Sequence, residues 1–283
     1  IEKDVVISTW QSIYKMPRKY FDQFGCVIGD EAHMFKAKSL TGIMTKMHHC
    51  RYRFGLTGTL DGTQTHQLVL EGLFGAVEKV VTTKQLIDKN TLAKLKIKCV
   101  ILKHNKIKEK MTYAEEMDYL VSKESRNNFI LDLCNTINGN TLCLFQLVEK
   151  HGKILYDGMK EKENVYFVYG GTDTDQREKI RGLVEGHNRS TTIASYGTFS
   201  TGINIRNINN IVLASPSKSK IRVLQSIGRG LRTSSTKDSI LVYDIADDIS
   251  YNERRNFTLN HFTERLNIYN EEQFDYDISK VKL

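Results

Sequence analysis

The fold is decided by one stretch, Cys26-Val27-Ile28-Gly29-Asp30-Glu31-Ala32-His33, in which a short apolar run ends in two adjacent carboxylates. An apolar run that passes through a small residue into polar side chains is typical of a strand in a parallel sheet flanked by helices. Folds of this kind bind their ligands outside the carboxyl ends of the strands. We therefore predict an α/β fold with a ligand site beside Asp30 and Glu31.

The same rhythm of strand, turn and helical pattern recurs along the chain. It predicts strands at residues 5–9, 26–28, 53–56, 141–145, 165–169, 192–195, 211–214 and 240–243. A chain of 283 residues can bury two cores, so we expect two domains. The lysine-rich and then polar segment 84–125 interrupts the rhythm, and we place the domain boundary near residue 91. Residues 270–283 are predicted to form a weakly ordered end.

The composition is that of a globular protein, with 40% hydrophobic and 26% charged residues. Apolar runs are shorter than the roughly 18 residues that a membrane helix needs, and the first residues lack a signal-peptide pattern, which predicts a cytoplasmic protein. Because the chain begins at Ile1 and enters an apolar pattern at once, we expect that a segment normally precedes it. The five cysteines form no CxxC pair and are predicted to be reduced core thiols.

The positive charge is concentrated in one region. The formal net charge is +8, and nine lysines stand between residues 84 and 110 against Asp88 and Glu109. This clustering favours a polyanionic partner such as nucleic acid. An alternative interpretation is equally good at this stage: Lys94, Lys96 and Lys98 alternate with apolar residues, as on an edge strand that lysines protect from sheet-to-sheet pairing.

Two groups of residues indicate phosphoryl-transfer chemistry. Asp30 would hold a Mg²⁺ ion through water, and Glu31 would orient and deprotonate an attacking water. The segment Gln225-Ser226-Ile227-Gly228-Arg229-Gly230-Leu231-Arg232 places Gln225, Arg229 and Arg232 on one face if it is helical. The rigid guanidinium fork matches the charge spread of a transferring γ-phosphoryl group. A hydroxyl-rich loop, residues 197–205, could offer N–H and hydroxyl groups to a nucleic-acid phosphate.

Taken together, the order and spacing of five segments resemble the superfamily 2 helicases. The segments are Val-Ile-Ser-Thr-Trp (6–10), Asp-Glu-Ala-His (30–33), Leu-Thr-Gly-Thr (56–59), Ser-Thr-Gly-Ile-Asn-Ile (200–205) and Gln-Ser-Ile-Gly-Arg-Gly-Leu-Arg (225–232). Within that group, residues 207–232 look most like the phage recombination helicases and their XPB-like relatives. The resemblance covers residues 1–250.

The resemblance implies two RecA-like lobes with parallel sheets, the first incomplete at its N-terminus. Residues 1–90 would be the C-terminal half of lobe 1, 91–250 lobe 2 and 251–283 a helical C-terminal tail. ATP with Mg²⁺ would lie in the cleft between the lobes. The implied activity is that of an ATP-dependent helicase that remodels junctions, stalled forks and R-loops in recombination, repair and replication. Its partners would be branched or single-stranded DNA or RNA–DNA hybrid, and the protein would be a monomer.

The resemblance also assigns roles to single residues. Asp30 and Glu31 would be the magnesium and water-activating carboxylates, and His33 would link hydrolysis to the other lobe. Arg229 and Arg232 would be arginine fingers, with Gln225 in the same cleft. Gly202 and Asn204 would bind the nucleotide. The Thr57-Gly58-Thr59 segment would couple hydrolysis to lobe movement. The positions implied to contact nucleic acid are Thr9, Thr57, Thr59, Gly171, Thr198 and Thr201.

The sequence departs from the family pattern in three places. Leu60 stands where relatives often have proline, and Gly29 stands where a branched apolar residue is usual. The GxxxxGK[ST] phosphate loop is missing from the 283 residues, and the pair Gly152-Lys153 lies in a helical pattern that favours a structural role. Without this loop, we expect the chain alone to bind ATP poorly and hydrolyse it hardly at all. Two rivals remain: a double-strand translocase that never separates strands, and a degenerate ATPase that serves as a nucleic-acid-binding platform.

Overall fold

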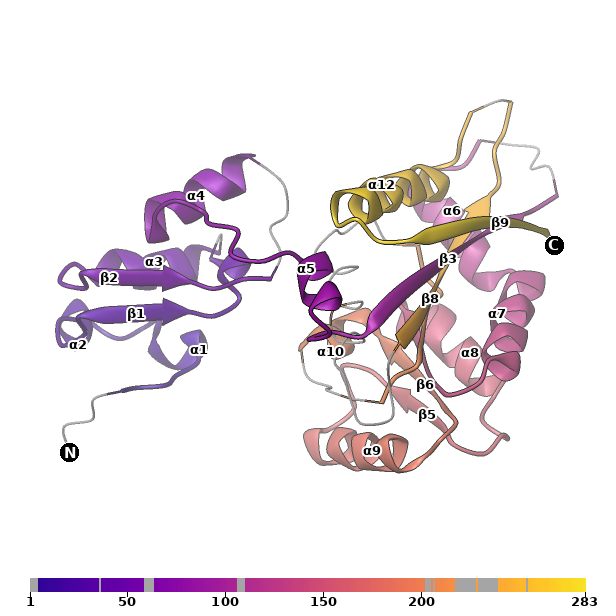
Figure 1. Ribbon diagram of the computed structural model, residues 1–283, viewed down its shortest axis with the longest axis horizontal. Coiled ribbons are helices and arrows are strands. Elements are labelled where there is room, and N and C mark those ends of the chain that lie inside the picture. The colour runs from indigo at the N-terminus through magenta and orange to yellow at the C-terminus, as the bar shows by residue number, and fades with distance from the viewer. Residues whose placement is uncertain are drawn as a thin grey trace. The chain divides into compact units, whose positions relative to one another are not determined.

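The computed structural model describes residues 5–35, 37–58, 64–105, 110–201, 205, 207–216, 228, 239–252 and 254–283. Contacts divide the chain into two compact units, Ile1–Val80 and Val81–Leu283. Most elements of both units carry their labels in Figure 1. Within the described ranges, no helix is long and apolar enough to cross a membrane.

Unit 1 is built on two parallel strands, β1 (Cys26–Gly29) and β2 (Tyr52–Gly55), paired from Cys26↔Tyr52 to Gly29↔Gly55. The strands predicted at 26–28 and 53–56 are therefore confirmed. The other elements are α1 (Trp10–Ile13), α2 (Arg18–Phe21), the 3-10 helix η1 (Ala32–Met34), α3 (Lys38–Lys46) and α4 (Gln64–Phe74). Its core is formed by Phe21, Phe35, Leu40, Ile43, Met44, Met47, Cys50 and Leu70.

The strand predicted at residues 5–9 is wrong. These residues pair with no strand in the described part of the chain, and Val5 and Ile7 are 72% and 95% exposed. An apolar run becomes a strand only where a neighbouring strand accepts its hydrogen bonds and another layer covers its side chains.

An aromatic pair explains the unusual glycine before Asp30. The rings of Phe35 and Phe74 meet edge to face with centroids 5.1 Å apart. A Cβ atom on Gly29 would come within 2.8 Å of Phe35 Cζ, and one on Gly55 within 2.9 Å of Phe74 Cδ2. The volume that a branched side chain would take at position 29 is thus filled by these two rings.

Replacing Gly29 with valine should therefore destabilise unit 1 by about 1–3 kcal/mol, because the side chain overpacks a filled site. Chemical unfolding followed by the fluorescence of Trp10, the single tryptophan of the chain, measures this loss. The double variant Gly29→Val/Phe35→Leu should recover part of it. A Gly29→Val protein as stable as the parent would show that the rings move aside freely.

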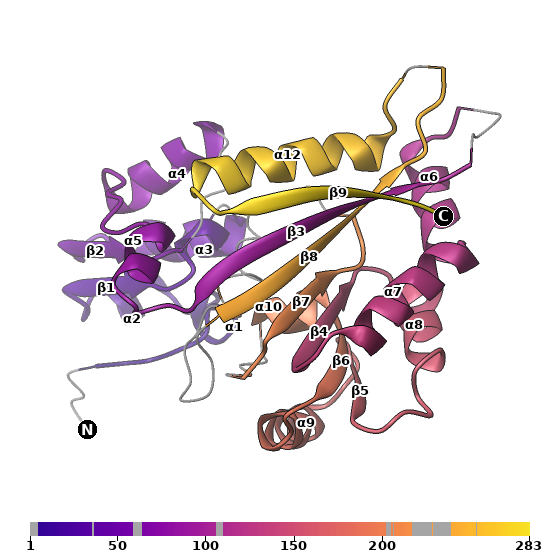
Figure 2. The same ribbon diagram turned by 45° about the vertical axis from the view of Figure 1, so that its right-hand side comes forward.

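Unit 2 is a seven-stranded parallel sheet in the order β5-β6-β4-β7-β8-β3-β9 (Figure 2). The strands are β3 (Lys94–Lys103), β4 (Asn140–Phe145), β5 (Val165–Val168), β6 (Ser190–Ser195), β7 (Asn210–Leu213), β8 (Ser239–Asp248) and β9 (Tyr276–Lys282). The strands predicted within residues 141–243 are all confirmed. They form the α/β fold that the sequence predicts.

Helices cover both faces of this sheet. They are α5 (Thr83–Asp88), α6 (Tyr113–Ser122), α7 (Glu124–Thr136), the π-helix η2 (Val148–Gly152), α8 (Lys153–Asp157), α9 (Thr174–Gly186), α10 (Tyr196–Thr201) and α12 (Phe257–Glu271). On one face, Ile97 and Cys99 of β3 pack with α9 and α12 residues such as Val184 and Phe262. On the other, Leu102 of β3 packs with α7 and α8. The alternation of side chains along β3 thus supplies both cores.

Strand β3 is not an edge strand, so one of the two interpretations of its lysines is wrong. It lies between β8 and β9, with Lys94↔Ser239 and Ile97↔Tyr276 among its pairs. Lys96 Nζ lies 2.9 Å from Asp277 Oδ2 on β9, and Lys98 Nζ lies 5.7 Å from the centroid of the Tyr243 ring. Lys96 and Lys98 thus contact side chains on the neighbouring strands β9 and β8 of the same sheet. A polyanion partner for the wider lysine region stays a prediction.

The unit boundary also differs from the predicted one. Helix α5, which we placed in the first domain, belongs to unit 2. Ile87 of α5 and the following Leu92 pack on the unit 2 core, and Thr83 Oγ1 donates to Glu272 Oε2 at 3.2 Å. The predicted tail, 251–283, is integral to unit 2, because α12 buries Phe262 and Tyr269 and β9 completes the sheet. Strand β9 was not predicted because its sequence is too polar to show the apolar pattern of a strand.

Candidate functional site

Asp30 and Glu31 directly follow strand β1, so they lie at the carboxyl edge of the β1–β2 sheet. Both carboxylates are exposed, and Asp30 Oδ1 accepts a hydrogen bond from the Glu31 N–H at 2.9 Å. Glu31 has the left-handed conformation, with φ 49° and ψ 49°. A side chain with a Cβ atom pays strain there, and such residues cluster at functional sites, so the outlier motivates a functional hypothesis for Glu31.

His33 connects the ends of the two strands. Its ring is buried, and Nδ1 lies 3.0 Å from Thr57 Oγ1 and 3.2 Å from Glu31 Oε2. The backbone repeats the connection: Ala32 N–H donates to Leu56 O at 2.8 Å, and Leu56 N–H donates to Gly29 O at 2.8 Å. Segment 30–33 and the described part of segment 56–59, residues 56–58, thus lie side by side and form one hydrogen-bonded block.

The donor set at this edge fits a magnesium ion held together with a bound nucleotide. Mg²⁺ takes one or two protein carboxylates and completes its octahedron with waters and substrate phosphates. Asp30 and Glu31 supply two exposed carboxylates on consecutive residues. In the described part of the chain, no group of three or more His, Cys, Asp or Glu side chains could hold a metal alone. The arrangement therefore suits a metal that arrives with phosphates rather than a structural ion.

Several candidate residues lie outside the described residues: Thr59, Gly202, Asn204, Gln225, Arg229 and Arg232. Their roles, and the helical face expected for residues 225–232, stay predictions. Thr201 is the last residue of α10, but its side chain is likewise outside the description. Gly152 and Lys153, in contrast, have the structural role predicted for them: a Cβ on Gly152 would meet the Phe145 ring at 2.5 Å, and Lys153 pairs with Glu149.

The remaining candidates lie at strand or helix ends. Thr9 is exposed at the N-cap of α1, with Oγ1 3.0 Å from Ser12 Oγ. Gly171 is exposed in the turn between β5 and α9. Thr198 is only 4% exposed, and its Oγ1 lies 2.8 Å from Ser195 Oγ. A hydroxyl that is buried and bonded in this way is a poorer phosphate contact than an exposed one, so of these three Thr9 and Gly171 are the more accessible.

A buried polar network that sequence reasoning missed ties together the loops at the carboxyl edge of unit 2. Ser215 follows β7, and its Oγ accepts from the Gln146 N–H at 3.1 Å and lies 2.9 Å from His151 Nδ1. Tyr196 OH donates to Ser215 O at 3.0 Å. The residues just after β4, β6 and β7 are thus joined through one serine. No spacing rule links residues 69 apart, which is why the sequence carried no signal.

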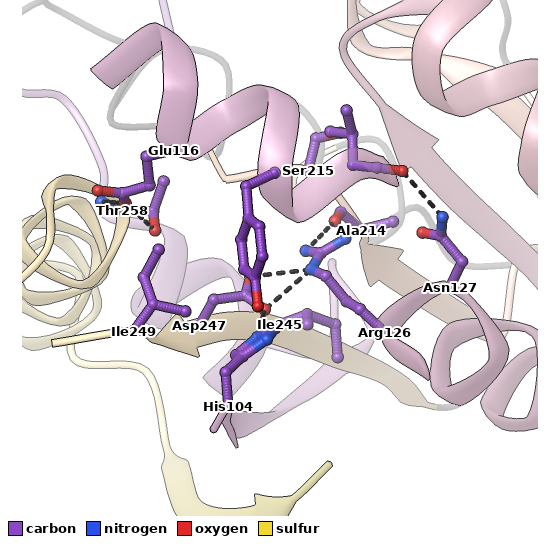
Figure 3. A network of polar contacts seen from close by, with 12 residues as sticks. His104, Glu116, Arg126, Asn127, Ala214, Ser215, Ile245, Asp247, Ile249 and Thr258 are labelled. Atoms are coloured by element: carbon purple, nitrogen blue, oxygen red, sulfur yellow. Dashed lines mark hydrogen bonds and ion pairs between the residues drawn. The ribbon is translucent and has the colours of Figure 1, made fainter. Parts of the chain in front are cut away.

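The network continues toward β3 and β8 (Figure 3). Arg126 Nε donates to Asp247 Oδ1 at 2.9 Å and to Oδ2 at 3.0 Å, and its Nη2 donates to Ala214 O at 2.7 Å. His104 Nε2 lies 2.9 Å from the same Asp247 Oδ1. Burial opposes ionisation of Asp247, but the Arg126 charge and hydrogen bonds from His104 and Arg126 hold its pKa below the usual range. The carboxylate stays charged and fixes the edge.

Because His151 is buried, we expect the free energy of unfolding to depend on pH. Burial first, and the Arg126 charge second, lower the pKa of His151 from 6.5 to about 3. The unfolded chain therefore binds one more proton than the native protein between these values, so stability is complete above pH 6.5 and falls as the pH drops toward 3. Urea unfolding followed by circular dichroism at several pH values should show this slope.

The variant His151→Gln should flatten that slope by about 1.4 kcal/mol per pH unit, the contribution of one proton. His49→Gln, which changes an exposed histidine of unit 1, serves as the matched control. An unchanged slope in His151→Gln would mean that His151 is protonated in the native protein.

Two family models match the chain. Residues 114–234 match the helicase conserved C-terminal domain, and residues 1–62 match the type III restriction enzyme, res subunit. The ATP-dependent DNA helicase uvsW of Enterobacteria phage T4 is 35% identical over 99% of this chain and 59% of its own length. The putative ATP-dependent RNA helicase L396 of Acanthamoeba polyphaga mimivirus is 24% identical, over 86% of this chain and 47% of its own. The chain thus spans about half the length of these relatives.

Solved structures agree in fold. The crystal structure of T4 UvsW superposes with a TM-score of 0.59 at 33% identity, covering 96% of this chain and 57% of that one. A fragment of a putative HsdR subunit of a type I restriction enzyme from Vibrio vulnificus YJ016 has a TM-score of 0.71 at 16% identity, covering 96% of this chain and 51% of that one. At that identity the second match speaks for the fold alone.

Proposed function

Since the chain belongs to the superfamily 2 helicases, we propose that it supplies part of an ATP-dependent motor that remodels branched DNA, with junctions, stalled forks and R-loops as substrates. Helicase relatives imply use of ATP. The branched substrate, a role in recombination, repair and replication, and a monomeric state are the finer parts of the proposal. The comparison that supports it most is 35% identity to a phage DNA helicase over 99% of the chain.

The observation that carries the motor proposal is the block formed by Asp30, Glu31, His33 and Thr57. A protein that merely bound nucleic acid would need no carboxylate for activating water, yet Glu31 is exposed at a strand end and its carboxylate lies 3.2 Å from a buried histidine. That histidine contacts Thr57 after the next strand. These two contacts support the proposed coupling, because a change at Glu31 would reach Thr57 through one ring.

In the proposed reaction Glu31 orients a water and takes its proton at Oε1 or Oε2. His33, held by Thr57, keeps the Glu31 carboxylate in place. Asp30 is the candidate carboxylate for a nucleotide-bound Mg²⁺, which would neutralise charge developing on the phosphates. Gln225, Arg229 and Arg232 are proposed to meet the γ-phosphoryl group, with Gly202 and Asn204 near the nucleotide.

Nucleic acid is proposed to contact Thr9, Thr57, Thr59, Gly171, Thr198 and Thr201. The exposed positions support direct phosphate contacts at Thr9 and Gly171. For Thr198, whose hydroxyl is bonded to Ser195, the proposal rests on the adjoining loop rather than on that hydroxyl.

The test measures ATP hydrolysis of the chain alone and of the chain extended at its N-terminus by a segment with a phosphate loop. We expect hardly any hydrolysis by the 283 residues alone and, in the extended protein, hydrolysis that four-way junctions stimulate more than single strands or linear duplex. Activity of the chain alone would overturn the need for the loop. Equal stimulation by linear duplex without strand separation would favour a double-strand translocase. Nucleic-acid binding without any stimulated hydrolysis would favour a binding platform.

A further inference from the structure

Unit 2 contains a hollow of about 520 Å³. Its lining residues belong to none of the five sequence segments that resemble helicase motifs. It lies where the loops after β3 and β8 meet the first turn of α12. The described residues that line it include Lys110 from the first loop, Tyr251, Arg254 and Arg255 from the second, and Phe257 of α12.

The floor of the hollow is fixed by a buried carboxylate. Glu116 of α6 is 2% exposed and accepts hydrogen bonds from the Phe257 N–H at 2.9 Å and from the Thr258 N–H and hydroxyl at 2.6 Å each. Asn256 Nδ2 donates to it at 2.9 Å. Both oxygens are therefore engaged, and the negative charge is offset by the N-terminal amides of a helix. The charge of this carboxylate is therefore partly offset, and protein donors already occupy its oxygens.

The described charged side chains of the rim, in contrast, are positive. Lys110, Arg254 and Arg255 are exposed, and none of the three has an ion-pair partner among the residues that the structure describes. The loop that carries the arginines is held in shape, because Tyr251 and Arg254 form an antiparallel bridge and the Ile249 N–H donates to Asn256 Oδ1 at 3.1 Å. Three exposed cations around a carboxylate that is already hydrogen-bonded by the protein favour a polyanion.

Aromatic rings stand beside the cations. Phe257 lines the hollow and is 43% exposed. Tyr113, 40% exposed, meets it edge to face with centroids 6.2 Å apart. Cations that follow a phosphate backbone, together with exposed rings on which bases stack, are the combination by which proteins hold single strands without sequence preference. A small inorganic anion would make no use of the rings.

The hollow lies on the same sheet edge as the candidate contacts Gly171 and Thr198 but not in their loops. Those residues follow β5 and β6, whereas the hollow follows β8 and β3, and β4 and β7 lie between. At about 4.8 Å per strand, β6 and β8 are roughly 14 Å apart. A strand that crosses the loops after β5 and β6 can therefore continue along the edge into the hollow.

We propose that this hollow is an additional nucleic-acid subsite, in which Lys110, Arg254 and Arg255 contact the phosphates of a single strand and Phe257 stacks on a base. The inference rests on the proposed function, because it extends the path of the nucleic acid that the motor holds. It adds a second place on the same sheet edge, after β8 and β3, where the protein would hold a nucleic-acid strand that has crossed the loops after β5 and β6.

The test compares three forms of the 283-residue chain by fluorescence anisotropy with a labelled single-stranded oligothymidylate over a range of salt concentrations. In Lys110→Ala/Arg254→Ala/Arg255→Ala, three lost phosphate contacts should make the slope of log K against log salt shallower by about 2. In Phe257→Ala, affinity should fall roughly 5- to 100-fold with the slope unchanged, since stacking releases no counterions. The matched control, Lys160→Ala/Lys162→Ala/Lys179→Ala, removes three exposed cations elsewhere in unit 2 and should leave both quantities close to the parent values.

Thermal unfolding checks that each variant folds, and Arg254→Lys/Arg255→Lys, which preserves charge, should retain the parent slope. Parent-like slope and affinity in the triple and Phe257→Ala variants would overturn the subsite while leaving the motor proposal intact. An equal loss in the control triple variant would also overturn it, because the effect would then be one of net charge. Failure of the extended protein to hydrolyse ATP with any nucleic acid, in contrast, would count against the proposed function itself.

Discussion

Replacing Glu31 with glutamine should lower nucleic-acid-stimulated ATP hydrolysis by about 10² to 10⁴-fold in the chain extended by a phosphate loop, because a general base contributes a factor of this size. The amide has the same shape but cannot take a proton from water. Single-turnover hydrolysis with saturating ATP measures the effect on the chemical step. Affinity for nucleic acid should be unchanged, since Glu31 is assigned to water and not to phosphates.

The matched control is Glu78→Gln, the same substitution at an exposed glutamate of unit 1 far along the sequence from the strand ends. It should behave like the parent. Parent-like hydrolysis in Glu31→Gln would show that Glu31 is not the general base. The hypothesis of a nucleic-acid-binding platform would then replace that of a motor.

Replacing Asp244 with alanine should destabilise unit 2 by about 3–5 kcal/mol, because removing one partner leaves a buried charge uncompensated. Asp244 and Arg265 are 0% and 2% exposed. Arg265 Nη2 donates to Asp244 Oδ1 at 2.7 Å and Nε to Oδ2 at 2.9 Å. Tyr269 OH donates to Oδ2 at 2.8 Å. For a domain of this size the midpoint of thermal unfolding should fall by roughly 10 °C, as calorimetry would show.

Two further variants separate the ion pair from its surroundings. Tyr269→Phe removes one hydrogen bond and should cost only about 1 kcal/mol. Asp244→Leu/Arg265→Met removes both charges and should be closer to the parent than Asp244→Ala is, because no charge is left unpaired. Equal losses in Asp244→Ala and the double variant would show that packing volume, not charge, governs this site.

Much of the sheet could be predicted because its strands are buried on both faces. Residues 141–145 and 211–214 form apolar runs that only a central strand explains, and both lie in the interior of the unit 2 sheet. Strand β9 could not be predicted in this way. It lies at the sheet edge with most side chains exposed, so its residues are polar and its place is set by pairing with β3, which no local pattern encodes.

The candidate site was predictable to the extent that it is local in sequence. Asp30 and Glu31 follow directly from the strand that positions them. The contact between His33 and Thr57 depends on the parallel pairing of β1 with β2. The sequence predicted both strands but not that they are neighbours. The Ser215, His151 and Tyr196 contacts join loops that are distant in sequence, and the hollow at Phe257 arises from two loops and a helix end. Both depend on the assembled seven-stranded sheet.

Pairing of β3 with β9 also governs when unit 2 can mature during translation. Ile97 and Tyr276 are register partners, so β3, the first strand of the unit, cannot complete its pairing until residues 276–282 have left the ribosome. Until then the edge of β3 that pairs with β9 in the finished sheet stays open, although β8 and α12, which precede β9 in the chain, can already cover its other edge and one face. Contacts of such large sequence separation slow folding, and exposed edges invite aggregation. The alternate lysines of β3 are well placed to keep that nascent edge soluble while it waits.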